Sequence, residues 1–524
     1  MNLLKSTGVI GGLTLVSRLA GFAREMIFAR VLGAGAVTDA FLMAFLLPNT
    51  FRRLFAEGAF SAAFVPMFSK RLHGEGGLEA ARTFSNDVMS VFLPVLVLLV
   101  ALFEIAMPGV VWLLASDWQE VPGQFELGIA LARITFPYIL LISLVTVFAA
   151  MLNSVSRFAP GASFPILLNL VMIVALLAGA AMRENGMGSD DIAILLAWAV
   201  AFGGVVQLGW VWFWARRAGF RPRFHRPRLT PEVKRLGIIA FPAALGTGAY
   251  QINQLVQVYF LNQLPSGALS YVNYADRLNQ LPLGIIGIAL ATAILPALSK
   301  HVGGGERAGA DRVQSNAIEL AMLLTLPAAA ALAVCALPFV TIVFLGGRFE
   351  AADALVTADV LTALVAGLPA YVLIKVLTPA FYARADTKTP VYAALASLGF
   401  FVAFNVAFLS RFGVVGVAAA SAIGAWLNCL ILYAILVRRD HYRASGALLS
   451  RLARQALAAA AMAGALWFAR AAMAGYYDGG FGERAFALAA LAGVGAVTYF
   501  GVAFAIGAVD RDRLGMLRRR KKAP

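Results

Sequence analysis

Residues 17–41, SRLAGFAREMIFARVLGAGAVTDAF, form an apolar run in which Arg18, Arg24 and Arg30 recur at equal spacing. The whole chain shares this apolar character, because 61% of its 524 residues are hydrophobic, 13% are charged and the mean hydropathy is +0.80. Soluble proteins do not have this composition. The sequence therefore predicts an integral membrane protein, and arginines inside an apolar helix need a physical explanation.

Long apolar runs separated by short polar stretches recur along the chain. This pattern is typical of a polytopic helical bundle and not of a membrane β-barrel. We predict an all-α membrane protein with about fourteen transmembrane helices. The predicted spans lie roughly at 7–32, 38–68, 86–115, 126–152, 160–182, 191–215, 234–262, 268–299, 314–345, 354–382, 390–410, 414–437, 452–474 and 485–509.

The net charge of +16 follows the predicted topology. Alternate connectors carry about 29 lysines and arginines, whereas the opposite connectors carry about four, namely Arg183, Arg348, Arg411 and Arg484. By the positive-inside rule, the richer connectors and both termini are predicted to be cytoplasmic. This orientation, together with contact to anionic lipids, explains the charge better than binding to nucleic acid does.

A repeat indicates two lobes. AFVPMFSK at 63–70 recurs as AILPALSK at 293–300, and a gapped match relates FPYILLISLV at 136–145 to LPAYVLIKVL at 368–377. Because an even number of predicted spans separates the copies, both have the same orientation in the membrane. We predict two six-helix lobes related by a pseudo-two-fold axis along the membrane normal, followed by two C-terminal helices. The predicted boundaries are 1–225, 226–440 and 441–524.

Some basic residues are predicted to lie at membrane depth, where each costs on the order of 2.5–3.5 kcal/mol at the bilayer centre unless it snorkels or faces water. Arg30, Arg133 and Arg470 lie near the ends of predicted spans and are interpreted as interfacial anchors. Arg18, Arg24 and Arg52 do not fit this explanation and are predicted to face a cavity. The full set is Arg18, Arg24, Arg30, Arg52, Arg53, Arg133, Arg277, Lys375 and Arg470.

Helix geometry leaves an ion pair open as an alternative role for Arg18 and for Arg53. Six residues separate Arg18 from Arg24, so the two side chains point about 120° apart and cannot share a narrow stripe. Arg18 and Glu25 lie on nearly the same face, and an ion pair between them is an alternative to a cavity role. Arg53 and Glu57 are spaced to pair with each other.

The second copy of the repeat is chemically different from the first. Its offset places Gly248, Gln254 and Pro282 opposite Arg18, Arg24 and Arg52. Charge in the second copy is concentrated in Asp276 and Arg277. We therefore expect an asymmetric cationic surface that is dominated by the first lobe.

Arginine suits a phosphate-bearing anion, because a guanidinium group donates parallel hydrogen bonds that lysine cannot reproduce. The predicted substrate is therefore an anion that carries phosphate. No GxxxxGK[ST] phosphate loop occurs in the sequence, and the four histidines lie in polar connectors. No catalytic residue, cofactor or metal is expected.

Three stretches resemble the MurJ (MviN) family of lipid II flippases, within the multidrug/oligosaccharidyl-lipid/polysaccharide exporter superfamily. They are SRLAGFAREMIFARVLGAG at 17–35, TDAFLMAFLLPNTFRRLFAEGAFSAAFVP at 38–66 and YADRLNQLPLGIIGIALATAILP at 274–296. With the fourteen-span layout, the resemblance covers essentially the whole chain. It implies two six-helix lobes around a central cavity, with two further helices that form a lipid-facing groove for a polyprenyl tail.

The resemblance also implies which residues act. The functionally important arginines of the family match Arg18, Arg24, Arg52 and Arg277, which would bind substrate. Asp39 matches an acidic residue of the second span and is expected to act as a gate, and the same motifs supply the supporting residues Asn49, Glu57 and Asp276. A sodium site of some members involves spans seven and eleven, where this chain has Asn253 and Asn405 but no acidic residue.

The expected function is that of a transporter and not an enzyme. It would move lipid II, a peptidoglycan precursor linked to undecaprenyl pyrophosphate, from the inner to the outer leaflet of the bacterial cytoplasmic membrane by alternating access, driven by the membrane potential. The expected partners are lipid II and the bilayer, with room for association with cell-wall synthesis proteins.

Three alternative functions compete with this expectation. The nearest is a flippase for another polyprenyl-pyrophosphate-linked oligosaccharide, because the charge argument is identical. A phosphatase or glycosyltransferase acting on polyprenyl phosphate would need carboxylates or histidines clustered at one membrane face, and the short connectors show no such cluster. A scaffold for cell-wall enzymes has no need of arginines at mid-membrane.

Overall fold

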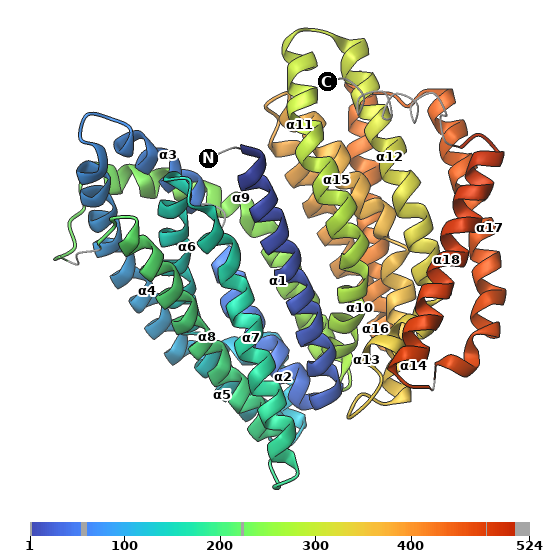
Figure 1. Ribbon diagram of the computed structural model, residues 1–524, viewed down its shortest axis with the longest axis horizontal. Coiled ribbons are helices and arrows are strands. Elements are labelled where there is room, and N and C mark those ends of the chain that lie inside the picture. Colours follow the sequence, from blue (N-terminus) through green and yellow to red (C-terminus); the bar gives the residue numbers. More distant parts are fainter. Residues whose placement is uncertain (1–2, 54–59, 222–224, 478, 509–524) are drawn as a thin grey trace. The chain divides into compact units, whose positions relative to one another are not determined.

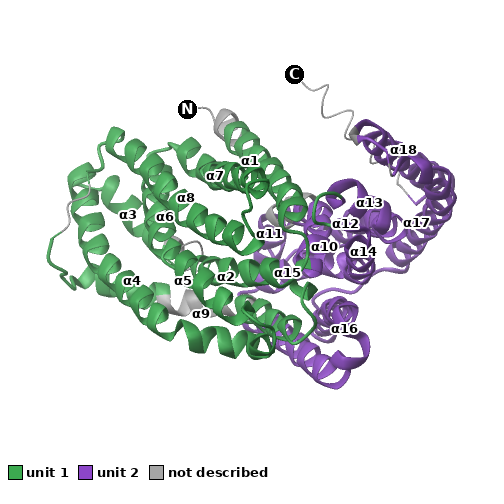
Figure 2. Cartoon of the chain, turned by 90° about the horizontal axis from the view of Figure 1, so that it is seen from below, with its two compact units in different colours: residues 1–270, 346–349 green, residues 271–345, 350–524 purple. Residues whose placement is uncertain are grey.

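The computed structural model describes residues 3–53, 60–221, 225–477 and 479–508, and this part of the chain is built from helices (Figure 1). The chain divides into two compact units (Figure 2). Unit 1 comprises Met1–Ser270 and Gly346–Phe349, and unit 2 comprises Tyr271–Leu345 and Glu350–Pro524. The all-α fold is confirmed, whereas the predicted lobe boundaries and the pseudo-two-fold axis stay predictions.

Unit 1 contains the α-helices α1 to α9, the short helix η2 and the start of α10. They are α1 (Leu3–Leu32), α2 (Ala36–Arg52), α3 (Ser61–Leu72), α4 (Gly77–Ala115), η2 (Ser116–Glu120), α5 (Gln124–Thr135), α6 (Tyr138–Ser154), α7 (Phe158–Arg183), α8 (Ser189–Arg217) and α9 (Pro231–Asn262). α1 packs along α7, and α7 packs on α8 (Figure 1).

Unit 2 contains most of α10 and the helices that follow. They are α10 (Ala268–Pro282), the π-helical turn η3 (Leu283–Gly287), α11 (Ile288–Gly303), α12 (Arg307–Val334), α13 (Ala336–Phe344), α14 (Ala351–Val365), α15 (Leu368–Tyr382), α16 (Lys388–Arg438), α17 (Gly446–Ala472), the short η4 (Ala474–Tyr476) and α18 (Phe481–Ala505). α17 and α18 lie side by side, and α17 also packs on α12.

Among the described residues, nine helical segments are long and apolar enough to cross a membrane. The segment Lys388–Arg438 covers two predicted spans, so the nine segments account for ten of them. The other four predicted spans coincide with α1, with α2 and α3, with α9, and with α10 and α11. The nine segments are Gly77–Glu120, Gln124–Ser154, Phe158–Arg183, Ser189–Arg217, Arg307–Val334, Ala351–Tyr382, Lys388–Arg438, Gly446–Ala472 and Gly482–Ala505.

Glycine and proline mark where several of these segments break. Gly413, inside α16, has φ 53° and ψ −143°, a conformation that favours glycine and that separates the predicted spans 390–410 and 414–437. Pro137 lies between α5 and α6, and Gly367 precedes α15. The two stretches that match in the sequence, at 136–145 and 368–377, therefore both begin at a helix break.

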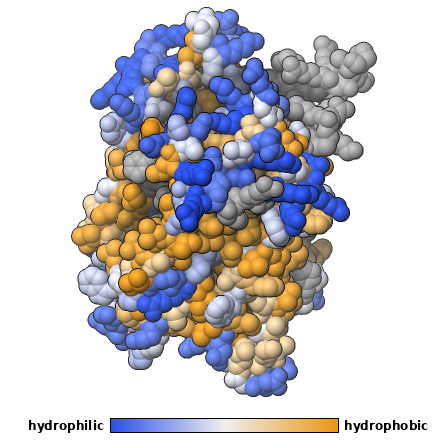
Figure 3. Space-filling model, turned by 90° about the vertical axis from the view of Figure 1, so that its left-hand side faces the viewer, coloured by the Kyte–Doolittle hydropathy of each residue, from blue (hydrophilic) through white to orange (hydrophobic). Residues whose placement is uncertain are grey.

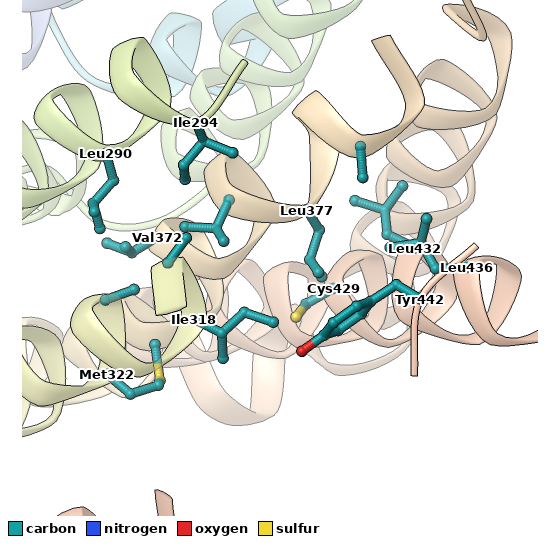
Figure 4. Packing of buried hydrophobic residues seen from close by; sticks show 14 of the residues in the cluster. Leu290, Ile294, Ile318, Met322, Val372, Leu377, Cys429, Leu432, Leu436 and Tyr442 are labelled. Atoms are coloured by element: carbon teal, nitrogen blue, oxygen red, sulfur yellow. The ribbon is translucent and has the colours of Figure 1, made fainter. Parts of the chain in front are cut away.

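Apolar side chains form the interior of each unit and also much of the surface. In unit 2, residues from α11, α12, α15 and α16 pack into one buried cluster, which includes Leu290, Ile318, Val372 and Leu432 (Figure 4). On the face that Figure 3 shows, apolar side chains form a band between two polar ends. A band of this kind is what a lipid bilayer requires of a protein surface.

Candidate functional site

Arg24 is almost fully buried where α1 packs on α7. The exposed fraction of Arg24 is 8%, and that of Glu25 is 4%. Nη2 of Arg24 donates to Oε1 of Glu25 at 2.5 Å, and Nη1 donates to Oδ1 of Asn169 on α7 at 3.1 Å. Asn169 in turn donates to the backbone carbonyl of Ser17 at 3.2 Å. The carboxylate of Glu25 thus neutralises this arginine, and the amide of Asn169 orients it. A buried charge needs both an ion-pair partner and hydrogen bonds, and Arg24 has them.

Arg18 lies on the same helix, but its side chain is exposed. Its neighbours Leu15 and Leu19 are 59% and 61% exposed, so this side of α1 does not pack within unit 1. Arg18 and Arg24 therefore lie in different environments, as their angular separation on the helix predicts. Helix spacing offered Arg18 as a partner of Glu25, whereas in the structure Glu25 pairs with the adjacent Arg24.

Arg52 is the last residue of α2 and is half-buried. The next residue, Arg53, is exposed, and its Nη1 donates to Oε1 of Gln254 on α9 at 3.3 Å. Gln254 therefore belongs to the surroundings of α2, although the repeat aligned it with Arg24. Nδ2 of Asn49 donates to the carbonyl of Phe45 in its own helix at 2.8 Å. Glu57, a predicted supporting residue and the expected partner of Arg53, lies outside the described residues.

Asp39 is in the first turn of α2 and is 3% exposed. Its Oδ2 accepts a hydrogen bond from the backbone N–H of Gly267 at 2.6 Å. Its Oδ1 accepts from the backbone N–H of Ser270 at 2.8 Å and from the hydroxyl of Ser270 at 2.5 Å. These donors belong to the first turn of α10 and the residue before it, which is where a helix carries unpaired N–H groups. Asp39 therefore fixes the start of α10 within unit 1.

Asp276 and Arg277 lie on α10 in unit 2, and both are half-buried. The amide of Gln280, one turn further along, donates to Oδ2 of Asp276. Arg18, Arg24 and Arg52 belong to unit 1. The convergence of the four arginines on one substrate stays a prediction.

Two further arginines that the sequence predicts at membrane depth, Arg133 and Arg470, contact nearby groups. Nε of Arg133 donates to the carbonyl of Glu104 on α4 at 3.2 Å. Nη1 of Arg470 donates to the carbonyl of Val334 at 2.8 Å, and its guanidinium stacks 3.6 Å from the centre of the Trp467 ring. Both arginines are thus held by a backbone carbonyl of their own unit, and Arg470 also by the ring of Trp467.

No cluster of three or more metal-binding side chains occurs in the described part of the chain. Both cysteines, Cys335 and Cys429, are buried free thiols. Asn405, one of the two asparagines noted for a sodium site, is 1% exposed and donates to the carbonyl of Phe401 in its own helix at 2.8 Å.

Unit 2 contains an apolar cavity of about 280 Å³ beside the two C-terminal helices. Helix α12 contributes Leu323 and Pro327, α17 contributes Met462 and Leu466, and α18 contributes Tyr499 with several small residues. The full lining is Leu323, Leu324, Pro327, Ala331, Cys335, Phe339, Met462, Leu466, Leu491, Ala492, Gly495, Ala496, Tyr499 and Phe500. Such a lining suits a hydrocarbon chain and offers almost nothing to a polar ligand.

Asn169, which orients Arg24, was not predicted from the sequence. The available signal was a single amide inside the otherwise apolar run ASFPILLNLVMIVALL of the fifth predicted span. Glu104, an acidic residue in an apolar helix beside Arg133, was not predicted either. Both are isolated polar residues in apolar helices, and such residues are functional candidates by default.

Comparison with known proteins gives consistent matches along the chain. The profile of the family described as "Lipid II flippase MurJ" matches residues 28–485. The protein is 42% identical to a "Probable lipid II flippase MurJ" of Rhizobium meliloti (strain 1021), over 100% of this chain and 97% of the relative. It is 34% identical to the "Lipid II flippase MurJ" of Burkholderia cenocepacia, over 85% of this chain and 86% of the relative.

Solved structures share the fold. A structure titled "Lipid II flippase MurJ, inward closed conformation" superposes with a TM-score of 0.76 at 21% identity and covers 94% of this chain and 97% of that one. An inward-facing multidrug resistance MATE family transporter of the MOP superfamily superposes with a TM-score of 0.64 at 15% identity, over 84% of this chain and 98% of that one.

Proposed function

Because the chain belongs to the lipid II flippase MurJ family, we propose that it moves lipid II from the inner to the outer leaflet of the bacterial cytoplasmic membrane by alternating access. The family assignment carries the substrate class, and the apolar helices agree with a multi-pass protein of the inner membrane. Both termini face the cytoplasm in this proposal, because the basic connectors and the basic tail lie on the same side.

The pyrophosphate of the substrate binds to Arg18, Arg24, Arg52 and Arg277 in this proposal. Arg18 is exposed and Arg52 is half-buried, so both have surface to offer an anion. Arg24 already pairs with Glu25, and a phosphate oxygen would have to replace that carboxylate. We therefore assign the first contact to Arg18 and Arg52 and a later contact to Arg24, once binding has displaced Glu25.

Asp39 acts as a gate residue in this proposal, with Asn49, Glu57 and Asp276 in supporting roles. What supports the gate is its set of three hydrogen bonds to Gly267 and Ser270, all of which involve a buried carboxylate. A movement of α10 relative to α2 would break these bonds together. Such a latch gives the protein two discrete states instead of a continuous range of positions.

The polyprenyl tail of the substrate lies in the apolar cavity beside α17 and α18 in this proposal. The cavity has almost no polar lining atoms, and its volume of about 280 Å³ accommodates only part of a long polyprenyl chain. The remainder of the tail stays in lipid, and the polar head group is held by the arginines elsewhere in the protein.

The membrane potential is the proposed driving force. Moving two negative charges outwards across an inside-negative membrane yields about 4.6 kcal/mol per 100 mV, at about 2.3 kcal/mol for each charge. The sequence contains no GxxxxGK[ST] phosphate loop through which a nucleotide could supply the energy instead.

Transport of lipid II by purified protein in proteoliposomes tests the proposal. Arg18→Ala and Arg52→Ala should each lower the transport rate by about tenfold or more, because each removes a charge-assisted contact to phosphate. Arg312→Ala is the matched control, since Arg312 is exposed and its Nε bonds only to the carbonyl of Ala308 in its own helix. Normal transport by both test variants would contradict the binding assignment.

Complementation separates lipid II from the alternative substrate, another polyprenyl-pyrophosphate-linked oligosaccharide. The chain should restore growth to bacteria depleted of their lipid II flippase. Failure to do so, by a chain that is expressed and inserted in the membrane, would favour the alternative substrate.

A further inference from the structure

Three arginines meet at one end of α1 in unit 1, and we call them the outer arginine cluster. Arg30 lies near the end of α1, Arg183 is the last residue of α7, and Arg348 lies in the loop between α13 and α14. Arg183 and Arg348 are two of only about four basic residues in the connectors predicted to be outside. Basic residues are scarce on this side, so their meeting near Arg30 is unexpected from topology alone.

Hydrogen bonds to consecutive carbonyls bring the arginines together. The backbone N–H of Arg348 donates to the carbonyl of Arg30 at 2.8 Å. Nη1 of Arg183 donates to the carbonyl of Val31, the next residue, at 2.9 Å, and its Nη2 donates to the hydroxyl of Ser189 at 3.2 Å. The end of α1 thus positions the guanidinium of Arg183 and the backbone of Arg348 next to each other.

Two glycines allow the loop to approach α1 this closely. Gly33 has φ +75°, and a Cβ at this position would lie 2.5 Å from the carbonyl oxygen of Arg348 and 3.2 Å from its Cβ. Gly347 has φ +60°, and a Cβ there would lie 2.1 Å from the carbonyl oxygen of Arg30. No larger residue fits either position without displacing backbone. The cluster is therefore held in place before any ligand arrives.

The cluster has excess positive charge. Arg348 is exposed and Arg183 is partly exposed, and they lie close enough for their charges to act on each other unfavourably. Neither Arg183 nor Arg348 forms an ion pair with a carboxylate in the described part of the chain. The side chain of Arg348 makes no hydrogen bond of its own there. An anion between like charges removes their repulsion and gains charge-assisted hydrogen bonds.

We propose that the outer arginine cluster binds a phosphate group of a lipid at the outer face of the membrane. Arg348 donates hydrogen bonds from its guanidinium. Arg183 donates from those guanidinium N–H groups that do not already bond to Val31 and Ser189. The phosphate comes either from the pyrophosphate of the transported lipid or from the phosphodiester of an outer-leaflet phospholipid. The outer location rests on the proposed function and its orientation.

Equilibrium binding to the full-length protein in neutral phosphatidylcholine nanodiscs tests the site. The probes are inorganic pyrophosphate and short-chain phosphatidylglycerol, which represent the two sources of phosphate. Arg348→Ala should weaken binding of at least one probe by roughly ten- to a hundredfold, and Arg348→Lys should restore part of the loss. The matched control is Arg411→Ala, which removes another exposed outer arginine that stacks on Phe412 at 5.6 Å instead of joining the cluster.

Each outcome has a definite meaning. A selective loss for pyrophosphate assigns the site to the transported lipid, and a selective loss for phosphatidylglycerol assigns it to an outer-leaflet phospholipid. Equal binding by wild type, Arg348→Ala and Arg411→Ala overturns the proposal, and so does an equal loss in both variants, because general charge would then be sufficient.

The location is tested separately from transport. Glu184→Cys places a thiol beside Arg183, and both native cysteines are buried. A membrane-impermeant maleimide added to intact cells should label Glu184→Cys. If it labels this position only after the cells are opened, the outer location is wrong. Because neither binding nor labelling requires lipid II transport, a failure of the proposed function would be seen independently.

Discussion

The contacts of Arg24 allow its structural role to be separated from a role in binding substrate. Arg24 and Glu25 form a pair whose side chains are only 10% and 5% exposed. Removing one partner of a buried pair leaves an uncompensated charge, which costs about 3–5 kcal/mol. We therefore expect Arg24→Met and Glu25→Met each to lower the free energy of unfolding by about 3–5 kcal/mol.

The double variant Arg24→Met/Glu25→Met removes both charges and fills their space with flexible apolar side chains. Replacing a buried pair by apolar residues is often neutral for stability. Here Oδ1 of Asn169 loses its donor, so a residual loss of about 1–3 kcal/mol is expected. Two single losses of this size and one small double loss correspond to a coupling free energy of about 3 kcal/mol or more.

Two measurements on these variants separate a structural role of Arg24 from a role in binding substrate. Denaturation in detergent micelles reports stability, and lipid II transport in proteoliposomes reports function. The double variant should lose only the residual stability of about 1–3 kcal/mol, and if Arg24 binds phosphate this variant should still transport at a rate at least about tenfold lower than the wild type. A stable double variant that transports normally would refute the substrate role of Arg24 and leave it a purely structural residue.

Three other perturbations have definite expected outcomes. Asp39→Asn should lower the thermal unfolding temperature, because an amide offers one acceptor oxygen where the carboxylate now accepts from Gly267 and Ser270 with two. Gly347→Ala should do the same, since its Cβ would collide with the carbonyl of Arg30, and circular dichroism melting checks both. Hydrogen bonds from Thr389 and the Arg439 charge hold the pKa of Asp386 at about 2, so its contribution to stability is present above pH 4 and is lost as pH falls through about 2. The acid-induced drop in melting temperature over that range should be smaller in Asp386→Asn, and an equal drop would contradict the assignment.

The fold could be predicted largely because the bilayer imposes a simple rule. Ten of the fourteen predicted spans coincide with helices that are apolar enough to cross a membrane, and the predicted break near residue 412 lies at Gly413. The breaks at Pro137 and Gly367 were not predicted, although both begin the matched stretches of the repeat. Apolar periodicity does not report them, because the residues on both sides of each break are equally hydrophobic.

The candidate site could be predicted by residue type but not by partner. The sequence identified Arg18 and Arg24 as unusual and predicted their different faces, and the structure separates them into one exposed and one buried side chain. The contact from Arg24 to Asn169 depends on how α1 packs against α7, which no local pattern encodes. The same holds for Arg348, whose position against Arg30 depends on the path of a loop from a distant part of the chain.

The difference between Arg18 and Arg24 bears on which of them better indicates a transport path. Arg18 is near the middle of α1, about 21 Å of helix from Leu32, and would be far from a membrane interface if α1 spans the bilayer as the sequence predicts. A buried and neutralised arginine such as Arg24 is compatible with any packed membrane protein, including a scaffold. An exposed arginine at that depth would cost on the order of 2.5–3.5 kcal/mol against lipid tails, so it requires water or an anion beside it. If α1 spans the membrane as predicted, it needs one packed face and one wet face, and the exposed Arg18 is then a stronger argument for the proposed transport path than the buried Arg24.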